Sequence, residues 1–301
     1  MNRWLTLPIL VLMLAACSEP AENTADSGVD DDPDAAVGGD EHVTLLAGDW
    51  TMSAGTEGYH CVRKTIEQDL WIKEFKPLAP EGTHHTALAI DFRNDPDGSF
   101  PCDAGTVGFN LLFGSGIGTE PFPLPEGIAY KVPAGSKLLL NLHLYNVSDS
   151  ELTGTSGVEV LVADPEDVVH EAETVYVLDY NLDVTPGESN HEVKCTVQDE
   201  ATVFGVFPHM HRMGAHMTAT IESEGGSPTV FFDKPYDFEE QYNHTIDPSF
   251  EIHPGDVIRG NCGFFNDTTE TVSFGDSSDD EMCVLGIYRY PASGGVGLCT
   301  G

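Results

Sequence analysis

The chain has 301 residues, and its 50 aspartates and glutamates far outnumber its 13 lysines and arginines, giving a formal net charge of −37 at pH 7. A surface with this charge repels nucleic acids and anionic lipid headgroups, so partners of both kinds are excluded. Apolar residues make up 40% of the chain, which is enough for a folded core, while 31 glycines and 19 prolines predict many turns.

The first residues have the pattern of an exported protein. Arg3 is followed by an apolar run over residues 5–14 that is too short for a stable membrane span. The residues LAAC that end at Cys17 are typical of a bacterial lipoprotein signal. We therefore expect residues 1–16 to be a signal peptide and Cys17 to carry lipid. An ordinary secretory signal with cleavage nearby is the alternative.

An acidic tether is expected to follow, over residues 17–42. Residues 18–41 contain nine acidic residues, no basic residue and almost no large apolar side chain. Such a segment repels itself and stays solvated. Ser18 resembles the sorting pattern for the bacterial outer membrane, so we expect a lipid-anchored protein there, on the periplasmic or cell-surface side. The link to the membrane is then the lipid alone.

The rest of the chain has the periodicity of strands. Residues 137–145, 157–162 and 217–222 alternate apolar and polar side chains, which is typical of antiparallel β-structure with little helix. These stretches predict an all-β fold of packed β-sandwiches.

Residues 43–301 suffice for two domains of ordinary size. We expect one strand to end at Ala163 and the next to begin near Thr174, which places the seam at residues 167–173. The predicted domains are therefore residues 43–170 and 171–301.

His209 and His211 are the strongest candidates for a metal site. On an extended strand, two residues one position apart share a face and lie about 6 to 7 Å apart, so both imidazoles can bind one ion. A polar strand face without metal also produces this pattern. Met282 adds a thioether beside Cys283, and two histidines with a methionine suit copper better than zinc.

A second candidate site combines His84 and His85 with His143. Adjacent residues of a regular strand point to opposite faces, so joint binding needs a bulge or a strand end, which Gly82 and Thr83 favour. His143 lies in an alternating strand, where a lone histidine is more often a core or surface residue. Two separate copper sites are the functional hypothesis.

The order of these motifs resembles a known family. THH at 83–85, His143, HMH at 209–211 and DEMC at 280–283 are similar to the copper type II, ascorbate-dependent monooxygenases, the family of peptidylglycine alpha-hydroxylating monooxygenase and dopamine beta-monooxygenase. Further motifs fall in the family's order: YHC at 59–61, FPCDAG at 100–105, LPEG at 124–127, PGD at 254–256 and GDSSD at 275–279. The resemblance covers roughly residues 43 to 301.

The resemblance implies a fold and a reaction. It implies two jelly-roll-like β-sandwiches that face each other across a cleft and hold one copper ion each. The implied reaction hydroxylates a C–H bond of a small organic substrate with O2 and an external reductant, such as ascorbate or another one-electron donor. The expected partners are therefore substrate, O2 and electron donor, and the expected oligomeric state is a monomer.

The resemblance also assigns roles to the ligands. His84, His85 and His143 would hold the copper that delivers electrons, because three imidazoles suit both oxidation states. His209, His211 and Met282 would hold the copper that binds oxygen and abstracts a substrate hydrogen, because a weak thioether favours Cu(I) and leaves a position open. Three nearby methionines are alternative ligands to Met282: Met210, Met213 and Met217.

The cysteines agree with an exported protein. If Cys17 carries lipid, six cysteines remain, an even number that allows several alternative disulfide pairings in an oxidising compartment. The resemblance selects Cys61 with Cys102, Cys195 with Cys299, and Cys262 with Cys283. A zinc site of the cysteine type is not expected because the chain lacks a C-x-x-C pair.

The resemblance disfavours a peptide substrate. In the peptide-hydroxylating members, an arginine two residues before the H-x-H pair holds the peptide carboxylate, and the corresponding residue here is Phe207. An asparagine and a tyrosine that follow the ligand methionine are replaced by Val284 and Gly286. An apolar or aromatic small molecule fits these residues better.

Two functions without catalysis remain as alternatives: a copper-binding or copper-buffering surface lipoprotein, and a structural surface module with vestigial sites. A blue-copper electron carrier is not expected, because no histidine follows Cys283.

Overall fold

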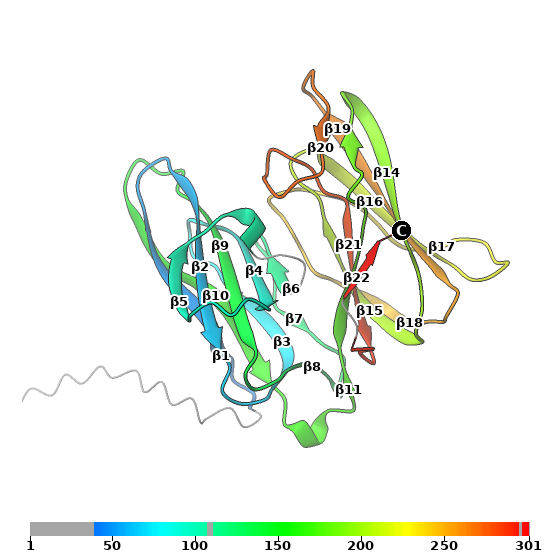
Figure 1. Cartoon of the computed structure of the whole chain (residues 1–301), viewed down its shortest axis with the longest axis horizontal. Coiled ribbons are helices and arrows are strands. Elements are labelled where there is room, and N and C mark those ends of the chain that lie inside the picture. The colour runs from blue at the N-terminus through cyan, green and yellow to red at the C-terminus, as the bar shows by residue number, and fades with distance from the viewer. Residues whose placement is uncertain (1–38, 107–110, 295–296, 301) are drawn as a thin grey trace, which may run out of the picture. The chain divides into compact units, whose positions relative to one another are not determined.

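A computed structural model describes residues 39–106, 111–294 and 297–300. The predicted signal peptide, Cys17 and most of the tether lie outside these residues. The described part is all-β, as predicted, with the short 3-10 helices η1 (Ala104–Thr106) and η2 (Pro165–Asp167) between strands (Figure 1). In this part of the chain no helix is long and apolar enough to cross a membrane.

The strands up to residue 171 form two sheets. Their bounds are β1 (Val43–Met52), β2 (Glu57–Thr65), β3 (Leu70–Leu78), β4 (Thr83–Asp91), β5 (Gly98–Pro101), β6 (Leu111–Ser115), β7 (Phe122–Pro123), β8 (Ile128–Val132), β9 (Lys137–Tyr145), β10 (Leu152–Val162) and β11 (His170–Glu171). One sheet has the order β1-β10-β3-β8-β11, with β7 beside β3, and the other has the order β5-β2-β9-β4-β6.

The later strands form three further sheets. Their bounds are β12 (Glu173–Leu178), β13 (Asp183–Val184), β14 (Gly187–Thr196), β15 (Ala201–His209), β16 (Gly214–Glu222), β17 (Thr229–Pro235), β18 (His244–Ile252), β19 (Val257–Asn266), β20 (Val272–Ser273), β21 (Val284–Tyr290) and β22 (Leu298–Thr300). The sheet orders are β18-β15-β21-β12-β22, β14-β19-β16-β17 and β13-β20.

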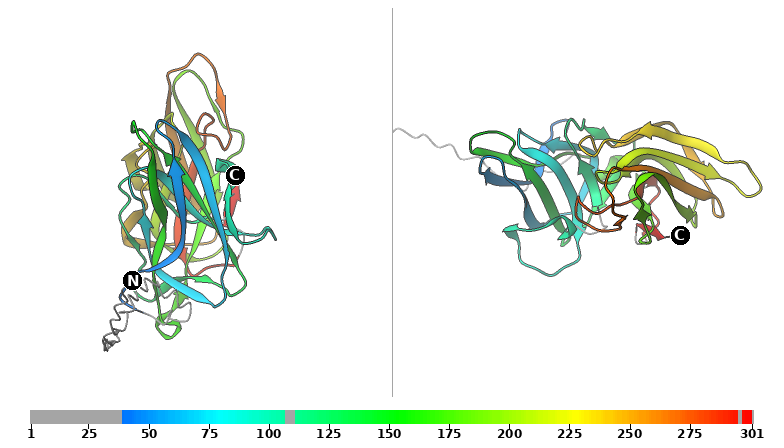
Figure 2. Two further views of the ribbon diagram at one scale, coloured as in Figure 1. Left: turned by 90° about the vertical axis from the view of Figure 1, so that its left-hand side faces the viewer. Right: turned by 90° about the horizontal axis from the view of Figure 1, so that it is seen from above.

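Sheet membership changes between β11 and β12. Within the described residues, no sheet combines strands from both sides of Ala172, and the two groups of strands can be followed in the further views of Figure 2. This point lies inside the segment 167–173 where a domain seam was predicted. β10 ends at Val162 and β12 begins at Glu173, each within one residue of the expected position, but the short strand β11, which was not predicted, lies between them. The division into two domains stays a prediction.

An apolar core connects the two groups of sheets. One buried cluster includes Phe75 and Phe113 from the first group together with Phe204 and Tyr288 from the second, and a separate cluster lies among the later strands. Burying one side chain of this size contributes roughly 1.5 to 3 kcal/mol. The strand β9 has the bounds predicted from alternation, but both of its faces are buried. Its alternation therefore does not mark a solvent-exposed face.

Three disulfides are present, with the pairing that the resemblance implies: Cys61–Cys102, Cys195–Cys299 and Cys262–Cys283. The second joins residues 104 positions apart. Closing a loop of that length restricts the unfolded chain by roughly 4 to 5 kcal/mol in the chain-entropy model. The third disulfide ties Cys283, the residue after Met282, to Cys262 in β19.

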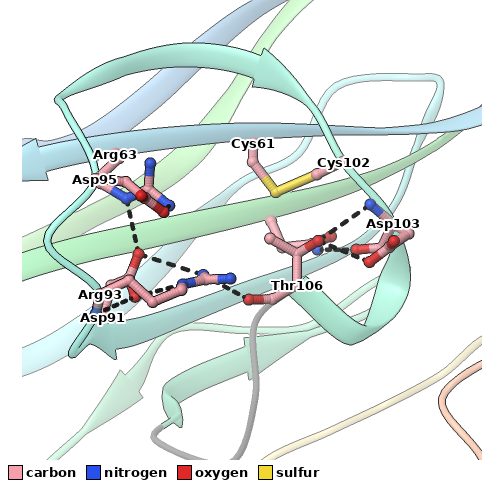
Figure 3. The surroundings of a disulfide bond; sticks show 9 residues. Cys61, Arg63, Asp91, Arg93, Asp95, Cys102, Asp103 and Thr106 are labelled. Atoms are coloured by element: carbon pink, nitrogen blue, oxygen red, sulfur yellow. Dashed lines mark hydrogen bonds and ion pairs between the residues drawn. A yellow bond between two sulfur atoms is a disulfide. The ribbon is translucent and has the colours of Figure 1, made fainter.

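An ion-pair network around the buried carboxylate of Asp91 joins β2, the end of β4 and η1 (Figure 3). Arg63 Nε and Arg93 Nε donate to opposite oxygens of the Asp91 carboxylate, at 2.7 and 2.8 Å. Burial opposes ionisation of Asp91, but these hydrogen bonds outweigh it and lower its pKa to about 2. Arg93 Nη2 also donates to the carbonyl oxygen of Thr106 at 2.7 Å, which fixes η1 beside the site described next.

Candidate metal centre

The first histidine set, His84, His85 and His143, comes from the paired strands β4 and β9. The register of this pair shifts between Thr83 and His85, so His84 is the extra residue of a β-bulge. The predicted irregularity after Gly82 is thus confirmed. Each of the three side chains offers a nitrogen, and these nitrogens lie within 4.8 Å of one another.

Hydrogen bonds in the first set leave the Nδ1 atoms free. His85 Nε2 lies 2.9 Å from the carbonyl oxygen of Phe238, and His143 Nε2 lies 2.6 Å from Glu57 Oε1. The Phe238 carbonyl and the Glu57 carboxylate are acceptors, so each Nε2 donates its proton to them and each Nδ1 keeps its lone pair. The Gln241 amide nitrogen, 3.2 Å from His85 Nε2, donates to the same Phe238 carbonyl at 3.1 Å. His84 Nδ1 is buried without a hydrogen-bond partner. An orphaned buried nitrogen of this kind fits a metal ligand.

Burial also keeps the first set neutral. It lowers the pKa of His84, His85 and His143, and the neighbouring imidazoles add to this effect at His85 and His143. Glu57 opposes the shift at His143. Tyr59 stacks on the His143 ring with 4.5 Å between centroids and fixes its plane. Neutral imidazoles are the form that binds transition metals.

The second ligand set is His209, His211 and Met282. The prediction that both histidines lie on one strand is wrong, because β15 ends at His209 and His211 follows it. The rings still come together, with centroids 5.2 Å apart. His209 Nδ1 donates to Gln241 Oε1 at 2.9 Å and His211 Nδ1 donates to the carbonyl oxygen of Asp280 at 3.1 Å, which leaves both Nε2 atoms free.

The pKa values of this second pair are also lowered. Burial, with the nearby His211, lowers the pKa of His209 to about 3, and burial lowers that of His211.

Glu281 ties His211 to Met282. One of its oxygens, Oε2, accepts from the backbone N–H of His211 at 3.0 Å and of Met282 at 3.1 Å, and Oε1 accepts from that of Met213 at 2.7 Å. The side chain is fully buried, and burial raises its pKa against these three hydrogen bonds. The alternative ligands Met210 and Met217 are completely buried in the core cluster of the later strands.

Both sets line one cavity of about 310 Å³, the first cavity. Its wall includes His85 and His143 from the first set and all three members of the second. Its remaining lining combines apolar side chains, among them Leu111, Phe207, Phe238 and Val284, with polar ones such as Ser115 and Asn141. Within the described lining there is no lysine or arginine, and Asp276 is the carboxylate.

Phe207 fills space that two glycines leave. A Cβ on Gly114 would lie 2.9 Å from Phe207 Cζ, and one on Gly286 would lie 3.1 Å from Phe207 Cβ. The aromatic side chain and the small residue at position 286 are therefore parts of one packing arrangement. Together they give this wall of the first cavity an apolar surface.

Sequence reasoning missed three polar residues at the site. Glu57 contacts His143, Glu281 orients the second set, and the Gln241 amide lies between the sets, with its nitrogen 3.2 Å from His85 Nε2. Glu281 lies inside the DEMC motif, so the motif marked this position as part of the site without indicating the role of Glu281. Gln241 lies between β17 and β18, where no periodicity or spacing marks it.

Comparison with known proteins adds the family. Residues 171–300 match the family described as "Copper type II ascorbate-dependent monooxygenase, C-terminal domain". Over residues 171–300 the chain is similar to the copper type II ascorbate-dependent monooxygenases. It is 27% identical over 253 residues to the peptidyl-glycine alpha-amidating monooxygenase of Mus musculus and to that of Rattus norvegicus, and both matches cover 78% of this chain. The chain spans 25% of the length of each of these relatives.

Likeness to solved structures is weak. The major capsid protein P2 of bacteriophage PM2 has 8% identity and a TM-score of 0.30, covering 83% of this chain and 100% of that one. A likeness at this level bears on neither fold nor function.

The donor atoms fit the copper that this monooxygenase family requires. The first set offers three neutral imidazoles, and the second offers two imidazoles and a thioether, and both are nitrogen and sulfur donors that copper prefers. The hydrogen-bond partners of the imidazoles are of the kind that orient metal-binding histidines.

Proposed function

We propose that this chain is a monooxygenase that holds two copper ions and hydroxylates a C–H bond of a small apolar or aromatic molecule. O2 is the oxidant, and ascorbate or another one-electron donor supplies electrons. The observation that carries the proposal is that oriented, neutral imidazoles from both sets, His85 and His143 with His209 and His211, line one cavity with an apolar wall at Phe207 and Val284. Copper-binding or copper-buffering without turnover would not require a substrate-sized cavity between the sets.

The residues of the chain divide the task. His84, His85 and His143 would hold one copper, and His209, His211 and Met282 the other. Bound copper would supply one-electron redox chemistry and oxygen activation. Glu57 and Phe238 keep Nδ1 of the first set unprotonated, while Gln241 and the Asp280 carbonyl do the same for Nε2 of the second. The apolar walls exclude water from the reacting C–H bond.

The lining of the first cavity supports the substrate class. A peptide with a free carboxylate needs a cationic partner, and the described lining offers none. Phe207 and Val284 present apolar surface instead, and the volume of about 310 Å³ suits a small molecule. Peptide amidation, which the name of the mouse relative describes, is therefore disfavoured for this chain.

Oxygen consumption by the copper-loaded protein is the direct test. We expect uptake that requires a reductant, is stimulated by simple aromatics, and is accompanied by a hydroxylated product. Peptides ending in glycine should give little stimulation. Two coppers per chain without substrate-stimulated uptake would support the buffering function instead.

We also propose that the protein is exported and joined to the bacterial outer membrane through lipid on Cys17. The sequence around that residue and the three disulfides support this, because disulfides persist in oxidising compartments.

A further inference from the structure

A second cavity, of about 540 Å³, lies against the first histidine set. Its wall includes His84 and His143 together with four charged residues: Glu57, Arg212, Asp237 and Glu239. His85 and the whole second ligand set line the first cavity and are not among the residues that line this one.

The first histidine set therefore separates two spaces. His143 and Phe238 belong to both walls, His85 faces the first cavity, and His84 faces the second. A molecule in the second cavity can contact the imidazoles of His84 and His143 without entering the space proposed for substrate. His84 is only 8% exposed and its Nδ1 has no hydrogen-bond partner, so this nitrogen is available to bind a metal ion next to the second cavity.

The charge of the second cavity is negative. Three carboxylates line it against one guanidinium, and Arg212 Nη1 already lies 3.2 Å from Asp279 Oδ1. Glu239 Oε1 reaches to 4.0 Å from His84 Nε2, and its side chain is 67% exposed. Cu(II) at the first histidine set would offset this net charge, but Asp237 and Glu239 are exposed to solvent, where they attract an approaching cation and repel an anion.

We propose that the second cavity is the docking site of the external electron donor, and that its carboxylates favour a small cationic donor over an anionic one such as ascorbate. This rests on the proposed copper site at His84, His85 and His143. Copper held there would accept one electron from the donor, and the donor would depart in its one-electron oxidised form. Substrate and donor then enter from different sides.

Reduction rates measured with donors of opposite charge test the proposal. The copper-loaded protein is mixed rapidly with hexaammineruthenium(II), a cation, or with ascorbate, an anion, and loss of the Cu(II) EPR signal is followed. Raising ionic strength from about 10 to about 150 mM shortens the screening length from roughly 30 to 8 Å. We expect the ruthenium rate to fall and the ascorbate rate to rise.

Charge variants separate the cavity from the acidity of the whole surface. Glu239→Gln should slow the ruthenium reaction by about tenfold and speed the ascorbate reaction by about threefold at low salt, as expected for one unit charge about 6 Å from a dication and from a monoanion in water. Glu224→Gln is the matched control: it removes the same charge from the turn between β16 and β17, outside the cavity wall. It should change neither rate by a comparable amount.

The outcomes are distinguishable. Equal rate changes in the Glu239 and Glu224 variants would overturn the docking site, since the overall charge would then explain the selectivity. The copper site itself is checked by metal content: His84→Ala should lose one copper per chain. A His84→Ala protein that keeps both coppers would overturn the proposed function, whatever the donor rates show.

Discussion

At the scale of single residues, Glu57 gives His143 a carboxylate at hydrogen-bond distance, whereas the carboxylate nearest to His84, that of Glu239, is 4.0 Å away. The Glu57 carboxylate oxygen lies 2.6 Å from His143 Nε2, whereas His85, His209 and His211 hydrogen-bond to neutral amide or carbonyl oxygens. A carboxylate makes the imidazole a more basic ligand, which stabilises the higher charge of Cu(II) over Cu(I).

We expect Glu57→Gln to weaken Cu(II) binding at the first histidine set by about tenfold. This is the lower end of the loss in metal affinity that is typical when a residue hydrogen-bonded to a metal ligand is replaced. Cu(I) binding should weaken less, because the lost charge matters less for a monovalent ion. Competition titrations with Cu(II) and Cu(I) chelators measure both. Glu81→Gln, an exposed carboxylate just before Gly82, is the control. Equal losses for both oxidation states would contradict this role.

Met282 is a second residue whose replacement should affect catalysis and copper binding to different extents. Met282→Ala should abolish product formation far more completely than it lowers copper content, because the thioether is a weak ligand beside two imidazoles yet sets the geometry and Cu(I) preference. Copper per chain and product are measured in parallel. Full turnover in this variant would show that Met282 is not the ligand, and Met213 would be the next methionine to test.

At the scale of elements, the bulge in β4 brings His84 and His85 to one site, and Gly82 controls how the strand enters it. Gly82 has φ +95°, and a Cβ there would lie 2.7 Å from Trp50 Cη2. Trp50 cannot easily move away, because its Nε1 donates to Ser156 Oγ at 2.7 Å in the core.

Gly82→Ala should therefore lower the free energy of unfolding by more than the roughly 1 kcal/mol expected for a left-handed residue alone. It should also reduce copper at the first histidine set and spare the second. Gly55→Ala is the matched control, because Gly55 also has positive φ (+64°) but nothing lies within 4 Å of its Cβ position. Denaturant unfolding and copper content compare the two; identical behaviour would argue against the Trp50 contact.

The β-class of the fold and several strands were predictable from the sequence, whereas the contacts around the histidines were not, and the ligand assignment stays a prediction. Alternation and turn residues are local signals, so they located β9 to the residue and predicted the irregularity at His84. Gln241 and Glu57 reach the histidines only because a loop packs across the first cavity and because β2 pairs with β9. Pairing and loop packing depend on residues far apart in the chain, which periodicity does not record.

At the scale of the whole molecule, acid stability should depend on the network around Asp91. Its pKa of about 2 lies below the unfolded value near 3.8, so its stabilisation is complete above pH 4 and is lost as pH falls towards 2. Asp91→Asn should cost about 2 kcal/mol at neutral pH. The difference from the wild type should shrink below pH 4. Urea titrations at several pH values measure this; a constant difference would contradict it.

Membrane attachment is also a property of the whole chain. Cys17→Ala should release the protein from the membrane fraction, because lipid on Cys17 is the proposed link and the acidic surface is repelled by anionic headgroups. Fractionation followed by immunoblotting measures this, with Cys17→Ala judged against the unaltered protein. Retention of the variant in the membrane would refute the lipid link.

The disulfide between Cys262 and Cys283 bears on the order of maturation. Cys283 directly follows Met282, and Glu281 just before it orients the backbone of both Met282 and His211. Until this bridge closes, the thioether is carried on a segment that lacks its covalent tie to β19. We therefore expect the second ligand set to acquire copper after oxidation of the chain, so that metal loading comes late in biogenesis.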